Sequence, residues 1–259
     1  MSDEQVRDDV RDACRILALF GVLNDVVGHV SARPSDDEVL LRCRTPDEEG
    51  LLFTRSSQVA SLAFKEGRVY GDQNGPTIPI EWPIHAAIYE ARPDIGAVVH
   101  AHPPGALMCG LAGVEVLPMR VYDYAPIRVI LEGVPTYPSA AMIDRPERAE
   151  GLVAALGDKH VCLMRGHGIV ATGATVREAT IRAIAYESAA RMTWRLANSG
   201  REIIHLSAEE IGDSSGSSSQ GDTAAAVHDG WADWSWRYYR RLLAERDAGR
   251  MVPVEKGWP

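Results

Sequence analysis

The 259-residue chain lacks the features that mark several classes of protein. It has no apolar stretch near the roughly 20 residues that a membrane-spanning helix requires. It has no run of Lys or Arg longer than the pair Arg240-Arg241, and its formal net charge is −9. Because nucleic acids and anionic membranes repel an acidic surface without a basic stripe, we expect neither as a partner.

Cysteine is also scarce in this chain. The four cysteines are far apart and none belongs to a C-x-x-C pair, which favours reduced, buried thiols over disulfides or a zinc–thiolate site. The first twelve residues are acidic, whereas a secretory signal begins basic and continues apolar. With 46% hydrophobic and 24% charged residues, the chain has an ordinary globular composition. We therefore expect a cytoplasmic protein.

The pattern of apolar residues alternates between helical and strand periods. Helical spacing predicts helices over about 2–23, 83–91, 104–111, 146–156 and 176–196. Short segments rich in β-branched residues predict strands near 29–31, 39–41, 51–53, 69–70, 95–102, 129–131, 134–136 and 160–165. This alternation predicts an α/β fold.

The C-terminal part of the chain differs from the rest. Residues 212–222 contain no apolar side chain, which predicts a flexible loop rich in Ser and Gly. Residues 223–259 follow with a helical, aromatic segment that we expect to dock on the body or on a neighbouring subunit. Residues 1–211 are then expected to form the catalytic domain.

Three histidines stand where a metal site would need them. His100 and His102 are two residues apart in a predicted strand that Pro103-Pro104 terminates, so both imidazoles face the same side. His167 stands between two glycines directly after another predicted strand, where the backbone can turn tightly. An H-x-H pair alone indicates a metal only weakly, and a histidine bonded to a buried carbonyl is the ordinary alternative.

A carboxylate strengthens the metal interpretation. Glu81 precedes the helix that begins near Pro83, and His85 follows four residues later. Three neutral imidazoles with an open position are typical of a catalytic Zn²⁺ site, in which a nearby carboxylate acts as acid or base. We predict one divalent metal ion, with zinc favoured and Mn, Fe, Co or Mg as alternatives. The predicted ligands are His100, His102 and His167.

Four segments together resemble a known family. They are GHVSAR at 28–33, EWPIH with Ile88-Tyr89 at 81–89, RPDI-x-AVVHAHP at 92–103 and RGHG at 165–168. In this order they resemble the class II aldolase/adducin family of metal-dependent lyases, from Val6 to about Ala197. The resemblance implies a three-layer αβα sandwich with a mainly antiparallel central sheet. It also implies metal on His100, His102 and His167, with Glu81 as catalytic acid or base.

The resemblance further implies a cyclic homotetramer with active sites at subunit interfaces. Tyr122 and Tyr124 lie where the family often supplies an active-site tyrosine from an adjacent subunit.

The phosphate-binding residues of the sugar-phosphate aldolases are replaced here. Where those aldolases have an Asn, this chain has His29. Where they have a Thr-Gly pair it has approximately Arg55-Ser56, and where they have two serines it has Pro79-Ile80. Because the last exchange removes two hydroxyl donors, we expect a non-phosphorylated substrate.

The GHVSAR segment resembles the family branch that contains dihydroxyphthalate and hydroxy-carboxymuconic semialdehyde decarboxylases. We therefore predict a carboxy-lyase of aromatic compound catabolism that acts on a small hydroxylated aromatic or related carboxylate. Glu81 or His85 is expected to deliver a proton to carbon, and a raised pKa from Ile80, Trp82 and Pro83 would suit Glu81 as an acid. The expected substrate-binding residues are His29, Ser31, Arg55, Ser57 and Tyr124.

Several alternatives stay open at this point. The same metal and glutamate would serve an aldolase that cleaves a non-phosphorylated hydroxy-keto compound. A three-histidine site can also host an iron-dependent oxygenase. An oligomerising module like the adducin head region would not need the intact metal ligands. His29 and His85 each have a structural role as their ordinary alternative, and Arg55 a place on the surface or at an interface.

Overall fold

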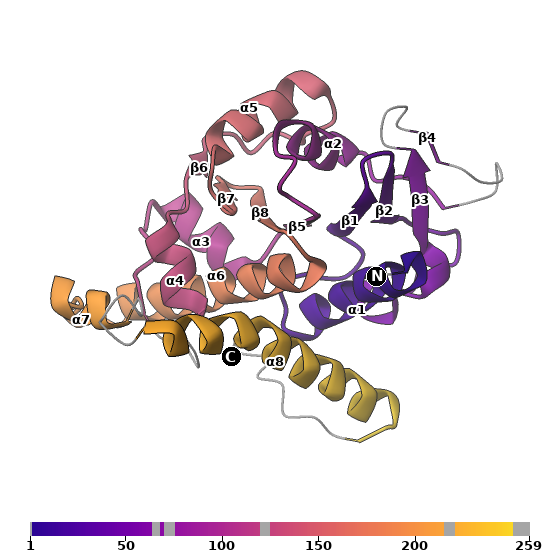
Figure 1. Ribbon diagram of the computed structural model, residues 1–259. Helices are drawn as coiled ribbons and strands as arrows, with labels where there is room; N and C mark the ends of the chain where they lie inside the picture. Colours follow the sequence, from indigo (N-terminus) through magenta and orange to yellow (C-terminus); the bar gives the residue numbers. More distant parts are fainter. Residues whose placement is uncertain (1, 64–67, 70–75, 120–124, 215–220, 251–259) are drawn as a thin grey trace.

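A mostly antiparallel sheet forms the middle of the molecule (Figure 1). The computed structural model describes residues 2–63, 68–69, 76–119, 125–214 and 221–250, and only the backbone at 68–69, 213–214 and 221–231. Within these residues the sheet has eight strands in the order β4-β3-β2-β1-β5-β8-β7-β6, and the one parallel pair is β6 with β7. The strands are β1 (His29–Ser35), β2 (Glu38–Arg42), β3 (Val59–Ala63), β4 (Arg68–Val69), β5 (Ala97–Ala101), β6 (Thr136–Tyr137), β7 (Val161–Met164) and β8 (Gly168–Gly173).

Helices cover both faces of this sheet (Figure 1). One layer consists of α2 (Trp82–Ala91) and α5 (Pro146–Leu156). The opposite layer consists of α1 (Asp3–Leu19), α3 (Pro104–Ala112), α4 (Ala125–Glu132), α6 (Val176–Ala197) and α8 (Gly221–Asp247). The expected three-layer αβα architecture with a mainly antiparallel sheet is confirmed.

Strand alternation divides the apolar side chains between two cores. Val98 on β5 and Val170 on β8 contact α2 and α5, whereas Val99 and Ala171 belong to the larger core beneath α1 and α6. His100 is two residues from Val98 and therefore faces the α2 side. This alternation directs the imidazole toward α2, the helix that carries the buried His85 and Tyr89.

Helix α2 brings polar groups to the sheet. Pro83 occupies its first turn, where the missing N–H costs nothing. Ile84 and Ile88 fill the smaller core, and His85 and Tyr89 are buried one turn apart on the same helix. Glu81 immediately precedes the helix as its N-cap residue. The packing of α2 thus places three polar side chains of one helix over the sheet.

Some predicted elements were wrong. Residues 129–131 lie in α4. Ala125 and Val129 are one helical turn apart and, with Ile130, pack in the larger core, where α4 contacts α6, and this packing overrides the β propensity of the segment. The predicted strand Leu51–Phe53 is a short 3-10 helix, η1, that buries Leu51 beside α1 and leaves Phe53 exposed. The first helix ends at Leu19 rather than near residue 23.

Other elements were not predicted or lie elsewhere. The strands β3 and β8 were missed, although β8 is buried along its whole length. Residues 212–214 of the predicted loop belong to helix α7 (Ala208–Ser214). Tyr70, at the end of the predicted strand 69–70, lies outside the described residues.

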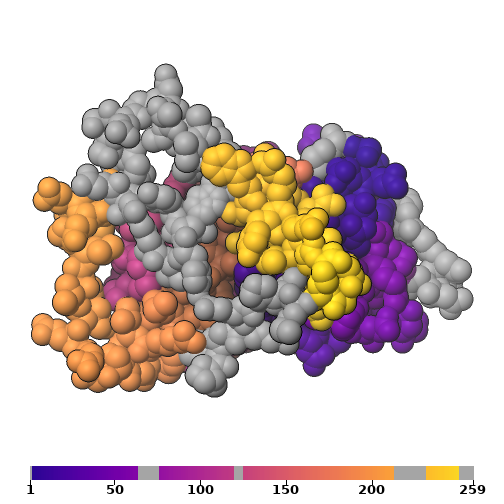
Figure 2. Space-filling view, turned by 90° about the horizontal axis from the view of Figure 1, so that it is seen from below, coloured from indigo at the N-terminus to yellow at the C-terminus, as the bar shows by residue number. Residues whose placement is uncertain are grey.

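Helix α8 lies against the body of the chain. Its Trp236, Leu242 and Leu243 join the larger core, and Arg240 forms an ion pair with Asp12 of α1. Figure 2 shows the last turns of α8, in yellow, beside the N-terminal helix in indigo. The division into residues 1–211, 212–222 and 223–259 stays a prediction.

The four cysteines are free and buried, as predicted. Burial raises the pKa of the Cys14 thiol to about 12, so it behaves as a small apolar side chain.

Each helix that the structure describes is too short or too polar to cross a membrane.

Candidate metal centre

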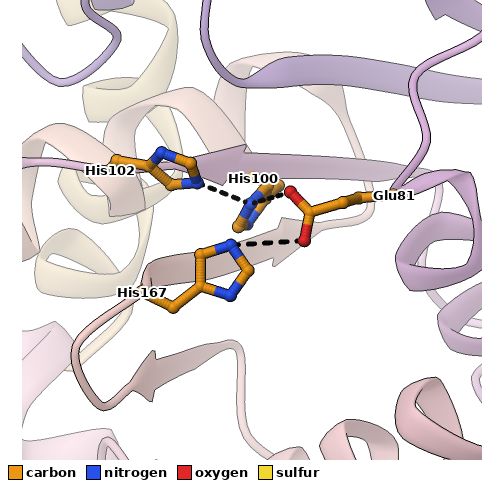
Figure 3. A group of neighbouring side chains, drawn as sticks. All are labelled: Glu81, His100, His102 and His167. Atoms are coloured by element: carbon orange, nitrogen blue, oxygen red, sulfur yellow. Dashed lines mark hydrogen bonds and ion pairs between the residues drawn. The ribbon is translucent and has the colours of Figure 1, made fainter. Parts of the chain in front are cut away.

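Four side chains from three parts of the chain converge at one end of the central strands (Figure 3). His100 lies in β5, His102 follows that strand, His167 lies in the turn between β7 and β8, and Glu81 precedes α2. One donor atom from each lies within 4.8 Å of the others. The structure therefore brings together the three predicted metal ligands and the predicted acid or base.

Strand pairing explains why distant histidines meet. β5 pairs with β8 so that Ala101 faces Ile169, which places the β7–β8 turn beside the end of β5. Gly166 has a φ of 72°, in the left-handed region that glycine adopts without strain. A Cβ on Gly168 would lie 2.2 Å from the carbonyl oxygen of Ala101. The two glycines around His167 thus permit both the turn and the close approach of the strands.

The backbone fixes the orientation of His100. Its Nδ1–H donates to the carbonyl oxygen of Ile169 at 3.0 Å. In the neutral imidazole this bond leaves a lone pair on Nε2. That Nε2 lies 3.0 Å from Nε2 of His102 and 3.3 Å from Oε2 of Glu81. An unprotonated nitrogen and a carboxylate at this distance repel each other unless a proton or a metal cation lies between them.

This donor set fits a divalent cation. Burial, followed by the neighbouring His100 and His167, lowers the pKa of His102 to about 4, so its imidazole is neutral and can donate a lone pair. Imidazole nitrogens and one carboxylate are the ligands of catalytic Zn²⁺ and related ions. His100, His102 and His167 are the residues that would hold the ion, with Glu81 at its edge.

Glu81 is held as an anion. Its Oε1 accepts a hydrogen bond from the backbone N–H of Ile143 at 2.9 Å and lies 3.2 Å from Nε2 of His167. Burial alone would raise the pKa of Glu81, but its contacts with His100 and His167 and the Ile143 bond hold that pKa well below its usual range. The expectation of a raised pKa was wrong, because these polar contacts outweigh burial and Ile80 points into solvent with 69% of its surface exposed.

A second row of polar side chains lies beside the centre. Nδ1 of His29 lies 2.6 Å from Nε2 of His85, and Nδ1 of His85 lies 2.5 Å from the Ser31 hydroxyl. Ser31 Oγ in turn lies 2.7 Å from the Tyr89 hydroxyl. All four side chains are buried. Burial, the largest effect, lowers the pKa of His85 to about 3 and places the pKa of His29 well below its ordinary value, so both rings are neutral.

Arg55 and Ser57, two of the remaining predicted substrate-binding residues, have other surroundings. Arg55 forms ion pairs with Asp47 and Glu49, at 2.6 Å each. Ser57 is exposed in the short helix η2 (Ser56–Gln58). Tyr124, like Tyr122, lies outside the described residues.

Three residues that form hydrogen bonds at the candidate site were not predicted from the sequence. Tyr89 ends the buried polar row, and its spacing of four residues from His85 was a usable signal. Ile143 and Ile169 act through backbone atoms, for which no residue type gives a signal.

Curated proteins and solved structures resemble this chain. The 3,4-dihydroxyphthalate decarboxylase of Arthrobacter keyseri is 34% identical over 206 residues, which cover 77% of this chain and 82% of that relative. The enzyme of the same name from Terrabacter sp. (strain DBF63) is 35% identical over 208 residues, or 79% and 87% of the two chains. An aldolase II superfamily protein from Pseudomonas syringae superposes with a TM-score of 0.78 at 24% identity and covers 95% of each chain, which shows a shared fold.

The family model agrees with this likeness. The model of the Class II Aldolase and Adducin N-terminal domain matches residues 8–194, and these residues include all four members of the metal centre. This match spans well over half of the chain. The chain therefore belongs to the class II aldolase and adducin family.

Proposed function

We propose that the protein is a divalent-metal-dependent, non-oxidative decarboxylase. Its substrate would be a non-phosphorylated, hydroxylated aromatic carboxylate of the dihydroxyphthalate kind or a related carboxylate. The observation that carries the proposal is the convergence of Glu81, His100, His102 and His167 in a chain about one third identical to 3,4-dihydroxyphthalate decarboxylases. The same donor set supports an enzyme over an oligomerising module.

Apolar side chains beside the centre support an aromatic substrate. Ile80 precedes Glu81 and is 69% exposed, and Met142 precedes Ile143, the residue that binds Glu81. Leu111 lies beside Gly166 in the His167 turn and is also exposed. We call Ile80, Leu111 and Met142 the apolar rim. Such a rim offers contact to a ring and no donor to a phosphate.

The ionised Glu81 fits a base that later acts as an acid. A divalent cation at this donor set supplies stabilisation of negative charge on a substrate oxygen. In our proposal Glu81 accepts the proton of the substrate hydroxyl. Glu81 returns this proton to the ring carbon that carries the carboxylate, so that carbon becomes tetrahedral, the oxygen becomes a carbonyl, and Glu81 is again ionised. The bond between that carbon and the carboxylate then breaks, CO₂ leaves, and the electron pair returns through the ring to the oxygen as the phenolate.

The proposal assigns different tasks to the two histidines of α2 and β1. His85 uses both ring nitrogens for His29 and Ser31, so it is a positioning residue rather than the proton donor to carbon. His29 lies with its ring centroid 5.1 Å from that of His100 and is the residue of this row nearest the ligands. We assign His29 to the substrate carboxylate or hydroxyl.

The remaining proposals concern the setting of the enzyme. We propose a cytoplasmic homotetramer with active sites at subunit interfaces and a role in aromatic compound catabolism. An interface would give a place to Tyr124 and to the exposed Arg55 and Ser57. Light scattering on the purified protein measures the mass of the assembly directly, and a monomer of 28.2 kDa would contradict this part of the proposal.

Metal analysis and product analysis test the function together. Purified protein should hold about one divalent ion per chain, and chelation should abolish activity until Zn²⁺, Mn²⁺, Fe²⁺, Co²⁺ or Mg²⁺ is restored. Incubation with 3,4-dihydroxyphthalate should release CO₂. Aldehyde release from a hydroxy-keto compound without CO₂ would favour the aldolase alternative, and oxygen uptake would favour an iron-dependent oxygenase. No metal bound after reconstitution would contradict all three.

A further inference from the structure

The backbone group that binds Glu81 has a second partner on its other side. The N–H of Ile143 donates to Oε1 of Glu81 at 2.9 Å, and this oxygen lies 3.2 Å from Nε2 of His167 (Figure 3). The carbonyl oxygen of Met142 belongs to the same peptide group and accepts a hydrogen bond from Nη1 of Arg148 at 2.7 Å. One peptide group therefore links a guanidinium to the carboxylate of the metal centre.

This peptide group transmits orientation because it is rigid and planar. In a trans peptide the C=O and the N–H point in opposite directions, so a bond that fixes the carbonyl also fixes the N–H. The side chain of Ile143 is fully buried in the smaller core and anchors one end of the group. Met142 at the other end is 49% exposed, so on that side the bond from Arg148 holds the carbonyl.

Arg148 is itself held in place on helix α5. Its Nη1 also donates to Oδ1 of Asp144 at 3.0 Å, one helical turn away. Helix α5 packs on α2, the helix that Glu81 precedes, so both ends of the link stand on elements of one layer. The neighbouring Arg145 differs, because its guanidinium bonds Asp144 alone among the described residues.

The charge of Arg148 strengthens the Ile143 N–H as a donor. A hydrogen bond from a charged group is about twice as strong as a neutral one, and it polarises the peptide that accepts it. Successive hydrogen bonds in a protein interior reinforce one another by about 10–30% per bond. Both bonds in this chain run from an N–H to an oxygen. Their direction is therefore fixed by the chemistry of the groups.

We propose that Arg148 positions Glu81 for proton transfer by orienting and polarising the Met142–Ile143 peptide group. The hydrogen bonds of Arg148 go to Met142 and Asp144, so Arg148 is a positioning residue and Glu81 is the catalytic one. The transfer of a proton by Glu81 rests on the proposed function. The link from Arg148 to the Ile143 N–H does not.

Loss of this link should affect the chemical step more than folding. A group that moves a proton must stay within hydrogen-bond reach of the atoms that exchange it, and a displacement of about 1 Å can cost 10²-fold in rate. Without Arg148 the exposed Met142 end of the peptide can turn and weaken the bond to Glu81. The Arg148 side chain is 35% exposed, and its ion pair with Asp144 adds little to the free energy of unfolding.

The amide signal of Ile143 tests the link without substrate. Zinc-loaded protein labelled with ¹⁵N-isoleucine gives one amide peak per isoleucine, and the Ile143 peak is assigned by its loss in Ile143→Val. Because a stronger hydrogen bond moves an amide proton downfield, we expect this peak to move upfield in Arg148→Ala. In Arg148→Lys, which keeps a cationic donor, it should return most of the way. Arg145→Ala is the matched control and should leave the peak in place.

Kinetics and urea unfolding provide the second measurement on the same variants. We expect kcat to fall about 10-fold in Arg148→Ala, with KM within about 3-fold and the urea midpoint close to that of Arg145→Ala. Arg148→Lys should recover kcat to within about 3-fold of wild type.

The outcomes separate this inference from the proposed function. An unmoved Ile143 peak in Arg148→Ala, an equal loss of kcat in Arg145→Ala, or wild-type kcat in Arg148→Ala would overturn the proposal. A moved Ile143 peak in a protein whose wild type releases no CO₂ would instead contradict the proposed function and leave the link from Arg148 to the Ile143 N–H intact.

Discussion

His29 and His100 face each other directly across the β1–β5 pair, in register, with ring centroids 5.1 Å apart. Because paired residues of adjacent strands project to the same face, His29 is carried to the metal centre by backbone pairing alone. Nδ1 of His100 donates to the carbonyl oxygen of Ile169, and Nδ1 of His29 is hydrogen-bonded to Nε2 of His85. In both rings Nδ1 therefore already has a partner within the protein. Nε2 of each ring is the atom to which we assign the proposed role, metal binding for His100 and substrate binding for His29.

Replacement of one histidine ligand should release the metal. His102→Ala removes one of three imidazoles, and we expect the metal content to fall from about one ion per chain to less than about a tenth after dialysis. Activity should fall at least 10²-fold. Elemental analysis of the variant beside His205→Ala, an exposed histidine distant in sequence from all ligands, provides the comparison. Full metal content and unchanged turnover in His102→Ala would exclude this centre as the active site.

Gly168→Ala should damage both stability and metal binding. The added Cβ would meet the Ala101 carbonyl oxygen at 2.2 Å and Cδ2 of His102 at 2.8 Å, so a strand and a ligand must both shift. Overpacking of this kind costs about 1–3 kcal/mol in the free energy of unfolding. Gly212→Ala is the control, because no atom lies within 4 Å of a Cβ at that site. Equal urea midpoints for the two variants would contradict the close approach of β5 and β8.

The convergence of the candidate metal ligands could be predicted from the sequence where one local rule determined each position. A period of two placed His100 and His102 on one face, glycines marked the His167 turn, and Pro83 marked the helix after Glu81. The ion-pair partners of Arg55 were not predicted, because the sequence does not show that its loop brings Asp47 and Glu49 to the guanidinium. The pKa of Glu81 was predicted in the wrong direction because burial, which raises that pKa, is outweighed by the contacts of the carboxylate with His100, His167 and the distant backbone N–H of Ile143. Long-range contacts, rather than local propensities, decided both cases.

The buried carboxylate of Glu187 binds the first turn of α3, the helix that follows His102. The Glu187 carboxylate accepts hydrogen bonds from the N–H groups of Gly105 and Ala106 at 2.9 Å each, at the start of α3, and pairs with Arg191. Glu187→Ala removes the acceptor of these two N–H groups and the carboxylate that pairs with Arg191, so we expect a loss of about 3 kcal/mol in the free energy of unfolding. Because α3 begins two residues after His102, zinc affinity should also fall about 10-fold.

Urea titration and zinc titration of Glu187→Ala measure the two effects separately. Glu209→Ala, an exposed glutamate of α7, is the matched control. A variant as stable as the control would show that the carboxylate does not hold the α3 terminus. A less stable variant with unchanged zinc affinity would show that the support does not extend to His102.

Buried neutral histidines should make the metal-free protein sensitive to acid. Burial lowers the pKa of His85 to about 3 from 6.5, so between these values the unfolded chain binds a proton that the native state does not. Stability therefore rises with pH in this window and is lost as the pH falls from about 6.5 toward 3, at about 1.4 kcal/mol per pH unit for one such group. His85→Gln removes this proton uptake and should flatten the dependence. Urea unfolding at pH 7.5 and 5 measures the slope, and equal slopes in wild type, His85→Gln and the exposed control His205→Gln would contradict a neutral His85.

The apolar rim should determine affinity for the aromatic ring rather than the rate of bond cleavage. Ile80→Ser removes apolar contact of a side chain that is 69% exposed without substrate, so a bound ring would lose part of a transfer free energy of about 1.5–3 kcal/mol. We expect KM to rise about 5- to 10-fold and kcat to change less than about 2-fold, because contact with the rim is equal in ground and transition states. Ile204→Ser, at a 94% exposed apolar residue after α6, is the control. A fall in kcat at constant KM would place Ile80 in the chemical step instead, and unchanged kinetics would exclude the rim from the ring-binding surface.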